Sequence, residues 1–254
     1  MASQSRPLLE PIREEFSEAL ATLEKVLVLG SNRGTDSTVR ISLLNSVIVA
    51  LVSTAEESLK DLFKAYLEVI EQNIGQHRLL PGPLQNSNLD SGIAILRVHI
   101  KENRSTAAAL ALQFAQCVNG GAPYVLFKDE LTNNRGNFRS GQVTTIAKNV
   151  GLTEFWQQLS DAVEILDLTG EADLAVRTSD VIRRWNEVYD ERDTIVHRIS
   201  QANGWAEGRI RDAMSLFKIV INRVTVCLSM SADSLIEQHR IRIGLRSSET
   251  REAP

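Results

Sequence analysis

Residues 181–200, with the sequence VIRRWNEVYDERDTIVHRIS, are the stretch from which the fold of this chain is best inferred. At about 100° per residue, the apolar side chains of this stretch gather around Arg192 on a helical wheel. These side chains are Val181, Trp185, Val188, Ile195, Val196 and Ile199. A guanidinium keeps its charge and is costly to bury alone, so Arg192 requires an anionic partner. An internal carboxylate, a partner chain or a bound phosphate would each serve.

His197 lies roughly 140° from Arg192 around the same helix, on the side that carries Asn186, Asp190 and Asp193. Asp193 precedes His197 by four residues. We expect this carboxylate, together with the negative end of the helix, to favour the protonated imidazole and to orient the ring. A fixed cation beside a titratable group suits a phosphodiester, because a guanidinium grips non-bridging oxygens and an imidazole moves protons near neutral pH.

The hexapeptide RDTIVH at residues 192–197 resembles the R-x4-6-H motif of the HEPN superfamily. It is most similar to the RiboL-PSP-HEPN type of ribonuclease domain, in which a polar residue follows the arginine and a short apolar pair precedes the histidine. A second block, AEESLKDLFKAYLEV at residues 55–69, resembles the first core helix of HEPN domains. The resemblance covers residues 39–243. It implies an all-α, HEPN-like helical bundle with additional N-terminal and connecting helices.

The same resemblance implies a function. HEPN-like ribonucleases pair two copies of the motif helix in a homodimer, so the catalytic residues would be Arg192, His197 and Asp193. The expected activity is a metal-independent endoribonuclease of the toxin or antiphage-defence type, which leaves 2′,3′-cyclic phosphate ends by 2′-hydroxyl attack. The implied partners are RNA, a second copy of the chain, and an antitoxin or another component of a defence system.

The remaining chain supports a bundle of helices. The helical period predicts helices over 7–29, 39–72, 91–118, 140–150, 153–168, 181–197 and 207–241. Ser53 and Thr54 indicate a re-start of the second helix. We also expect a loop over 75–88 and a cap for the central helix at Ser179 or Asp180. The domains expected are an N-terminal helical extension (1–38), a HEPN-like domain (39–243) and a polar tail (244–254).

Residues 131–153 contain no acidic side chain, although the whole chain has a net charge of −4. Arg135, Arg139 and Lys148 lie in this segment, and Arg198 directly follows the motif. These four residues are our candidates for contacts with the RNA backbone. An ordinary surface turn and helix is the simpler explanation of the 131–153 segment.

Composition narrows the class of protein. A chain of 254 residues with 43% hydrophobic and 24% charged residues is typical of a globular protein, and its net charge of −4 argues against a broad nucleic-acid-coating surface. We interpret Cys117 and Cys227 as free thiols. The sequence has no signal-peptide pattern, no apolar run long enough to cross a membrane, no nucleotide-binding motif and no metal-ligand spacing. We therefore expect a cytoplasmic protein without a cofactor, a metal or a membrane partner.

A second interpretation of the motif remains open. The chain would then be a non-catalytic HEPN-like module that binds RNA or protein. Arg192 would be a structural arginine, paired with a buried carboxylate such as Glu56 or Glu57.

Overall fold

The computed structural model describes residues 6–32, 34, 36–120, 122–133, 137–197 and 205–249. Within these residues the chain forms ten α-helices and one short 3-10 helix, and it forms no strand. The predicted all-α class is therefore confirmed.

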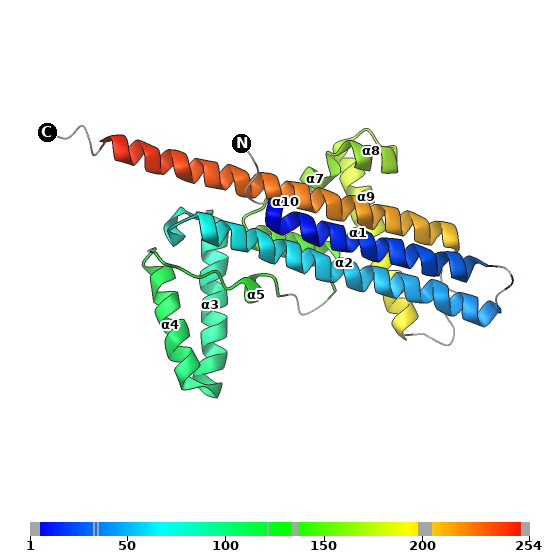
Figure 1. The fold of residues 1–254 in the computed structure, drawn as a ribbon, viewed down its shortest axis with the longest axis horizontal. Coiled ribbons are helices and arrows are strands. Elements are labelled where there is room, and N and C mark those ends of the chain that lie inside the picture. Colours follow the sequence, from blue (N-terminus) through cyan, green and yellow to red (C-terminus); the bar gives the residue numbers. More distant parts are fainter. Residues whose placement is uncertain are drawn as a thin grey trace.

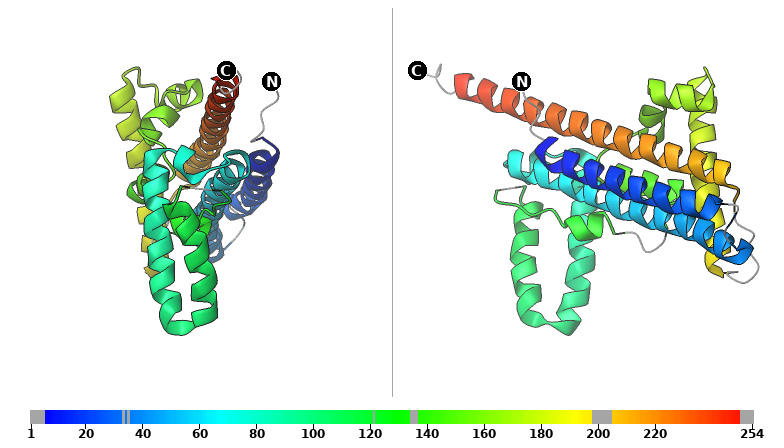
Figure 2. Two further views of the ribbon diagram at one scale, coloured as in Figure 1. Left: turned by 90° about the vertical axis from the view of Figure 1, so that its left-hand side faces the viewer. Right: turned by 45° about the vertical axis from the view of Figure 1, so that its right-hand side comes forward.

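Three long helices lie side by side and form the body of the molecule (Figures 1 and 2). They are α1 (Arg6–Ser31), α2 (Ser37–Asn73) and α10 (Glu207–Glu249). The Tyr66 hydroxyl of α2 is 3.2 Å from the Ser231 hydroxyl of α10, and Arg211 of α10 pairs with Glu24 of α1. The apolar residues of all three helices belong to one continuous core.

The sequence predicted these three helices closely, except for two features that were inferred from polar residues. Asp36 caps α2 as expected, because its carboxylate accepts hydrogen bonds from the backbone N–H groups of Thr38 and Val39. The possible re-start at Ser53 and Thr54 does not occur, and α2 runs through both. The last helix continues to Glu249, so the part of the expected polar tail that is described is helical.

The central helix, α9 (Leu174–His197), crosses the three long helices (Figure 1). It packs against α2 and α10, as predicted, and the ring of Trp185 stacks on Phe217 of α10 with centroids 4.2 Å apart. The predicted start of α9 is wrong. Asp173, rather than Ser179 or Asp180, caps the helix by accepting hydrogen bonds from the backbone N–H groups of Ala175 and Val176.

A helical hairpin projects from one side of the body (Figures 1 and 2). It consists of α3 (Gly82–Glu102) and α4 (Arg104–Val118), and the 3-10 helix η1 (His77–Leu79) precedes it. We predicted a loop over 75–88 and one helix over 91–118, and both predictions are wrong. Asn103 separates the two helices, because its extended backbone ends α3 while its side chain accepts a hydrogen bond from the Thr106 N–H of α4.

Four short helices connect the hairpin to α9. They are α5 (Lys128–Leu131), α6 (Ser140–Asn149), α7 (Phe155–Ser160) and α8 (Val163–Thr169). The predicted helix over 140–150 is confirmed as α6, whereas the predicted helix over 153–168 is two helices. Ala162 has an extended backbone and begins α8, so the chain changes direction there.

By length and composition alone, two helices within the described residues are long and apolar enough to cross a membrane, namely Ser37–Asn73 and Glu207–Ile241. Core helices pass the same test, and both of these helices contribute side chains to the core. The cytoplasmic location and the absence of a membrane partner stay predictions.

Candidate functional site

The C-terminal end of α9 carries all three residues that the sequence singled out as catalytic. Arg192 is partly buried, with 25% of its side chain exposed. His197 is the last residue of the helix and is exposed, and so is its apolar neighbour Val196. Ile195 is buried and holds this end of α9 against the core. The histidine therefore lies where another molecule can reach it.

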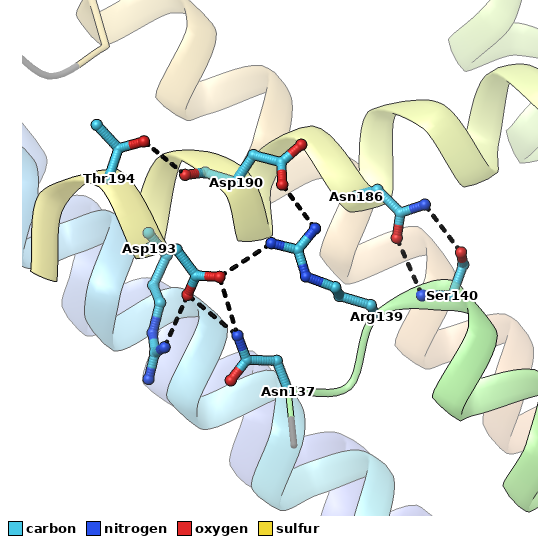
Figure 3. Close-up of polar contacts among 8 residues, drawn as sticks. Asn137, Arg139, Ser140, Asn186, Asp190, Asp193 and Thr194 are labelled. Carbon is cyan, nitrogen blue, oxygen red and sulfur yellow. Dashed lines mark hydrogen bonds and ion pairs between the residues drawn. The ribbon is translucent and has the colours of Figure 1, made fainter. Parts of the chain in front are cut away.

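Asp193 is the centre of the polar contacts at this end of α9 (Figure 3). Its Oδ1 accepts hydrogen bonds from Arg192 Nη1 at 2.9 Å and from Asn137 Nδ2 at 3.0 Å. Its Oδ2 accepts from Arg139 Nη2 at 2.9 Å and from Asn137 Nδ2 at 3.2 Å. The anionic partner that Arg192 requires is therefore the next residue in the chain.

Arg139 binds two carboxylates of α9 one turn apart. Its Nη2 contacts Asp193, and its Nη1 donates to Asp190 Oδ1 at 2.6 Å. Arg139 belongs to a short segment, residues 137–140, that leads into α6 and that we call the strap. Asn137 and Arg139 together join the strap to the acidic face of α9 (Figure 3).

The backbone of the strap is fixed as well. The Phe138 N–H donates to Glu56 Oε1 of α2 at 2.9 Å, and the Phe138 carbonyl accepts from Trp185 Nε1 at 2.9 Å. At the start of α6, the Ser140 N–H donates to Asn186 Oδ1 at 3.0 Å. Two helices thus hold the strap, and the orientation of Arg139 is set by groups other than Arg192.

These contacts shift the pKa values of the site. Burial opposes ionisation of Asp193, but hydrogen bonds from Arg192 and Arg139 outweigh burial, so the pKa of this carboxyl is lowered. The pKa of Arg139 is raised, chiefly by its hydrogen bond to Asp190. Tyr189 lies beneath the cluster with a buried hydroxyl, and burial together with the charge of Glu56 raises its pKa. All these groups keep their ordinary charge state at neutral pH.

The structure differs from our expectation for the role of Asp193. We expected this carboxylate to orient His197, but both of its oxygens accept hydrogen bonds from Arg192, Arg139 and Asn137. His197 makes no hydrogen bond or ion pair with any residue that the structure describes. Asp193 therefore holds the arginine of the motif and not the histidine.

The four candidate RNA contacts do not gather at one place within the described residues. Arg139 lies at the motif, but Asp190 and Asp193 already pair with it. Lys148 is exposed near the other end of α6, on the rim of a cavity of about 370 Å³ that is lined mainly by apolar groups of the α6–α7 region. Arg135 and Arg198 lie outside the described residues.

Sequence reasoning missed the partners of the motif. Asn137 was assigned no role, Asn186 and Asp190 were placed only on the His197 side of the helix, and Glu56 was expected to pair with Arg192 and not with the Phe138 N–H. A signal was present, because the acidic face of α9 and the acid-free segment 131–153 have opposite charges. Matching the two would have predicted that this segment packs against α9, although not which side chains pair.

The described residues contain no group of three or more His, Cys, Asp or Glu side chains that could hold a metal ion. Metal independence itself stays a prediction. No family model, curated protein or solved structure matches this chain.

Proposed function

We propose that this chain is a metal-independent endoribonuclease that acts as a homodimer, with Arg192 and His197 as its catalytic residues. The observation that supports the proposal most directly is the position of the motif. An exposed histidine and a guanidinium held by its neighbouring carboxylate lie about 1.4 turns apart at one end of α9. A cation and a proton carrier at this spacing suit cleavage of a phosphodiester.

A second copy of the chain completes the proposed site. On a single helix the two side chains point in directions roughly 140° apart, so they converge poorly on one phosphate. Two α9 helices related by a twofold axis would place two arginines and two histidines around one cleft. The exposed Val196 beside His197 gives this surface an apolar group to bury against the second copy.

The proposed chemistry uses one histidine from each chain. A neutral imidazole removes the proton of the 2′-hydroxyl, and the resulting oxygen attacks phosphorus. The protonated imidazole of the other chain donates its proton to the 5′-oxygen as the P–O5′ bond breaks. Arg192 stabilises the negative charge on the phosphorane. The products are a 2′,3′-cyclic phosphate and a 5′-hydroxyl. A toxin or antiphage-defence role, with an antitoxin or defence-system partner, follows from the HEPN resemblance and stays a prediction.

One observation favours a second candidate function. Arg192 has an anionic partner within its own chain, Asp193, so it does not need a bound phosphate to balance its charge. The partner is neither Glu56 nor Glu57, the carboxylates we expected under this interpretation. A HEPN-like module that binds RNA or protein without cutting would contain the same ion pair.

Cleavage assays on structured and unstructured RNA distinguish the two functions. We expect wild-type protein to cut RNA with the ends described above, equally well with EDTA. His197→Ala should lower kcat/KM by about 10²-fold to 10⁴-fold, as expected for loss of a general acid or base. Arg192→Lys should be little more active than Arg192→Ala, because an ammonium cannot bind a phosphate through two parallel hydrogen bonds as a guanidinium does.

His99→Ala is the matched control. His99 is a half-buried histidine of the α3–α4 hairpin, outside the proposed site, so its loss should leave the cleavage rate unchanged. RNA cleavage by His197→Ala at the wild-type rate, with contaminating nucleases excluded, would contradict the catalytic assignment. Tight RNA binding without cleavage by wild-type protein would support the second function instead.

A further inference from the structure

Arg139 lies in the chain of contacts that ends at Arg192, although 53 positions separate the two arginines in the sequence. The chain runs from Asp190 to Arg139 and from Arg139 to Asp193, with donor–acceptor distances of 2.6 and 2.9 Å (Figure 3). It continues from Asp193 to Arg192 at 2.9 Å. Each contact joins charged groups, which makes it stronger than a hydrogen bond between neutral groups. The position of Arg139 thus affects how Asp193 meets Arg192.

The strap gives Arg139 a fixed starting point. Phe138 is held at its N–H by Glu56 and at its carbonyl by Trp185, which is fully buried. Ser140, on the other side of Arg139, is held by Asn186 through both its backbone N–H and its hydroxyl. The Arg139 side chain therefore leaves from a backbone that is fixed on both sides, and its guanidinium can hold the carboxylate of Asp193 in one orientation.

Arg139 also divides the two oxygens of Asp193 between the two arginines. Oδ2 is occupied by Arg139, so Arg192 shares only Oδ1. Within the described residues, Arg192 forms a hydrogen bond through Nη1 alone. Its Nε is buried and has no partner there. If Arg139 were absent, Asn137 would be the remaining strap side chain on Asp193, and this neutral amide would not prevent the carboxylate from turning both oxygens to Arg192 in a bidentate pair. The guanidinium would then be less available to a phosphate.

The charges of the cluster point the same way. Two arginines, Arg139 and Arg192, face two carboxylates, Asp190 and Asp193, so the four groups balance. Removal of Arg139 leaves these two carboxylates, together with Glu56 beside the strap, against one positive charge near the place where a phosphate would bind. That excess repels an anion, and the partly buried position of Asp193 reduces screening by solvent.

We propose that Arg139 is a positioning residue for the ribonuclease reaction: it holds Asp193 so that Asp193 orients Arg192 through one oxygen and leaves Nη2 of Arg192 for the scissile phosphate. Asp190 is the counter-charge that holds Arg139 in turn. This inference rests on the proposed function. It assigns Arg139 a role within the protein instead of the direct RNA contact that its sequence context indicated.

The experiment is a double-mutant cycle read as kcat and KM for RNA cleavage. Arg139→Ala should lower kcat/KM by between about 10-fold and 100-fold, a size typical of a displaced catalytic group. Arg139→Lys should recover little, because one ammonium cannot bridge Asp190 and Asp193 with the geometry of a guanidinium. In an Asp193→Asn background, Arg139→Ala should have less than about a threefold further effect, because the group through which it acts is already altered.

A charge-balanced variant separates orientation from electrostatics. Arg139→Ala combined with Asp190→Asn removes one positive and one negative charge, so it should restore KM for RNA while kcat stays low. Full recovery of kcat would mean that Arg139 acts through charge alone and would overturn a positioning role.

Arg183→Ala is the matched control for stability. Arg183 lies on α9 and also pairs with two carboxylates, Asp180 and Glu187, but it has no described contact with the strap. We expect this variant to keep wild-type kcat/KM, and all variants to keep the helical circular dichroism of the wild type. An equal loss in Arg183→Ala and Arg139→Ala would overturn the inference, since both would then act through the stability of α9.

The outcomes separate this inference from the function on which it rests. Wild-type protein that cuts RNA and depends on His197, while Arg139→Ala cuts normally, overturns the positioning role alone. Independent effects of Arg139→Ala and Asp193→Asn overturn it in the same way. Wild-type protein that does not cut RNA overturns the proposed function and this inference together.

Discussion

His77 is an ionisable residue that is almost completely buried, with 2% of its surface exposed. Its Nε2 is 3.3 Å from Asn88 Nδ2, which also donates to the Val125 carbonyl at 3.0 Å. Because the amide nitrogen is a donor, Nε2 must accept, and the ring is then neutral with its proton on Nδ1. Burial lowers the pKa of His77, in agreement with this assignment.

The free energy of unfolding should therefore fall in mildly acidic solution. The pKa of His77 is lower in the folded chain than in the unfolded chain, where it is about 6.5. The stabilisation by neutral His77 is fully present above pH 6.5 and is lost as the pH falls through the folded value. Urea unfolding between pH 7.5 and 5.0 measures the effect. His77→Gln cannot titrate, so an equally steep decrease in this variant would show that other groups are responsible.

At the scale of single residues, the sequence predicted that a charged group needs a partner better than it identified the partner. The helical wheel correctly predicted that Arg192 needs an anionic partner. It could not identify Asp193 as that partner, because adjacent residues on a helix point about 100° apart and the contact depends on the rotamers of both side chains. It could not pair Arg139 with Asp190 either, since their contact depends on the path of the strap between α5 and α6.

Among the helices, the α3–α4 hairpin depends on one glycine where an aromatic ring of α4 approaches the backbone of α3. An ideal Cβ at Gly92 of α3 would lie 2.6 Å from Cδ2 of Phe114 on α4 and 2.7 Å from Cε2 of Phe127. Gly92 is itself buried, so the two rings pack directly over its backbone. Periodicity alone predicted a single helix over 91–118, because neither the Asn103 cap nor this close approach is visible in a repeat of apolar residues.

Gly92→Ala should lower the free energy of unfolding by about 1–3 kcal/mol, the cost typical of an overpacked contact. Alanine is the better helix former by roughly 0.5–1 kcal/mol, so a decrease would show that the contact with the two rings dominates. The exchange rates of the backbone amide hydrogens should increase most in α3 and α4, because the two rings have to move there.

Gly208→Ala is the control for this substitution. Gly208 lies in the first turn of α10, and a Cβ there would meet no atom within 4 Å. Its replacement should leave stability unchanged or raise it slightly. If Gly92→Ala were as stable as Gly208→Ala, the close packing of the hairpin would be contradicted.

Over the whole molecule, one core joins the long helices to α9, and this part was predictable. The positions of α2, α9 and α10 follow from apolar repeats that continue over several turns. The break between α7 and α8 could not be predicted from an apolar repeat, because these helices have only six and seven residues. Both helices are positioned by contacts with α9. They also set the direction from which the chain enters α9, and hence the start of that helix.

The homodimer is the remaining prediction at this scale, and subunit mixing tests it. If each cleft needs His197 and Arg192 from both chains, a heterodimer of wild type with an Arg192→Ala/His197→Ala double variant should be nearly inactive. After exchange of subunits with a tenfold excess of the double variant, most wild-type chains are in heterodimers, and activity should fall by roughly tenfold by mass action. Adding the same excess without time for exchange controls for competition for RNA. A monomer by light scattering at micromolar concentration, or undiminished activity after exchange, would contradict the shared cleft, because a single α9 would then suffice for cleavage.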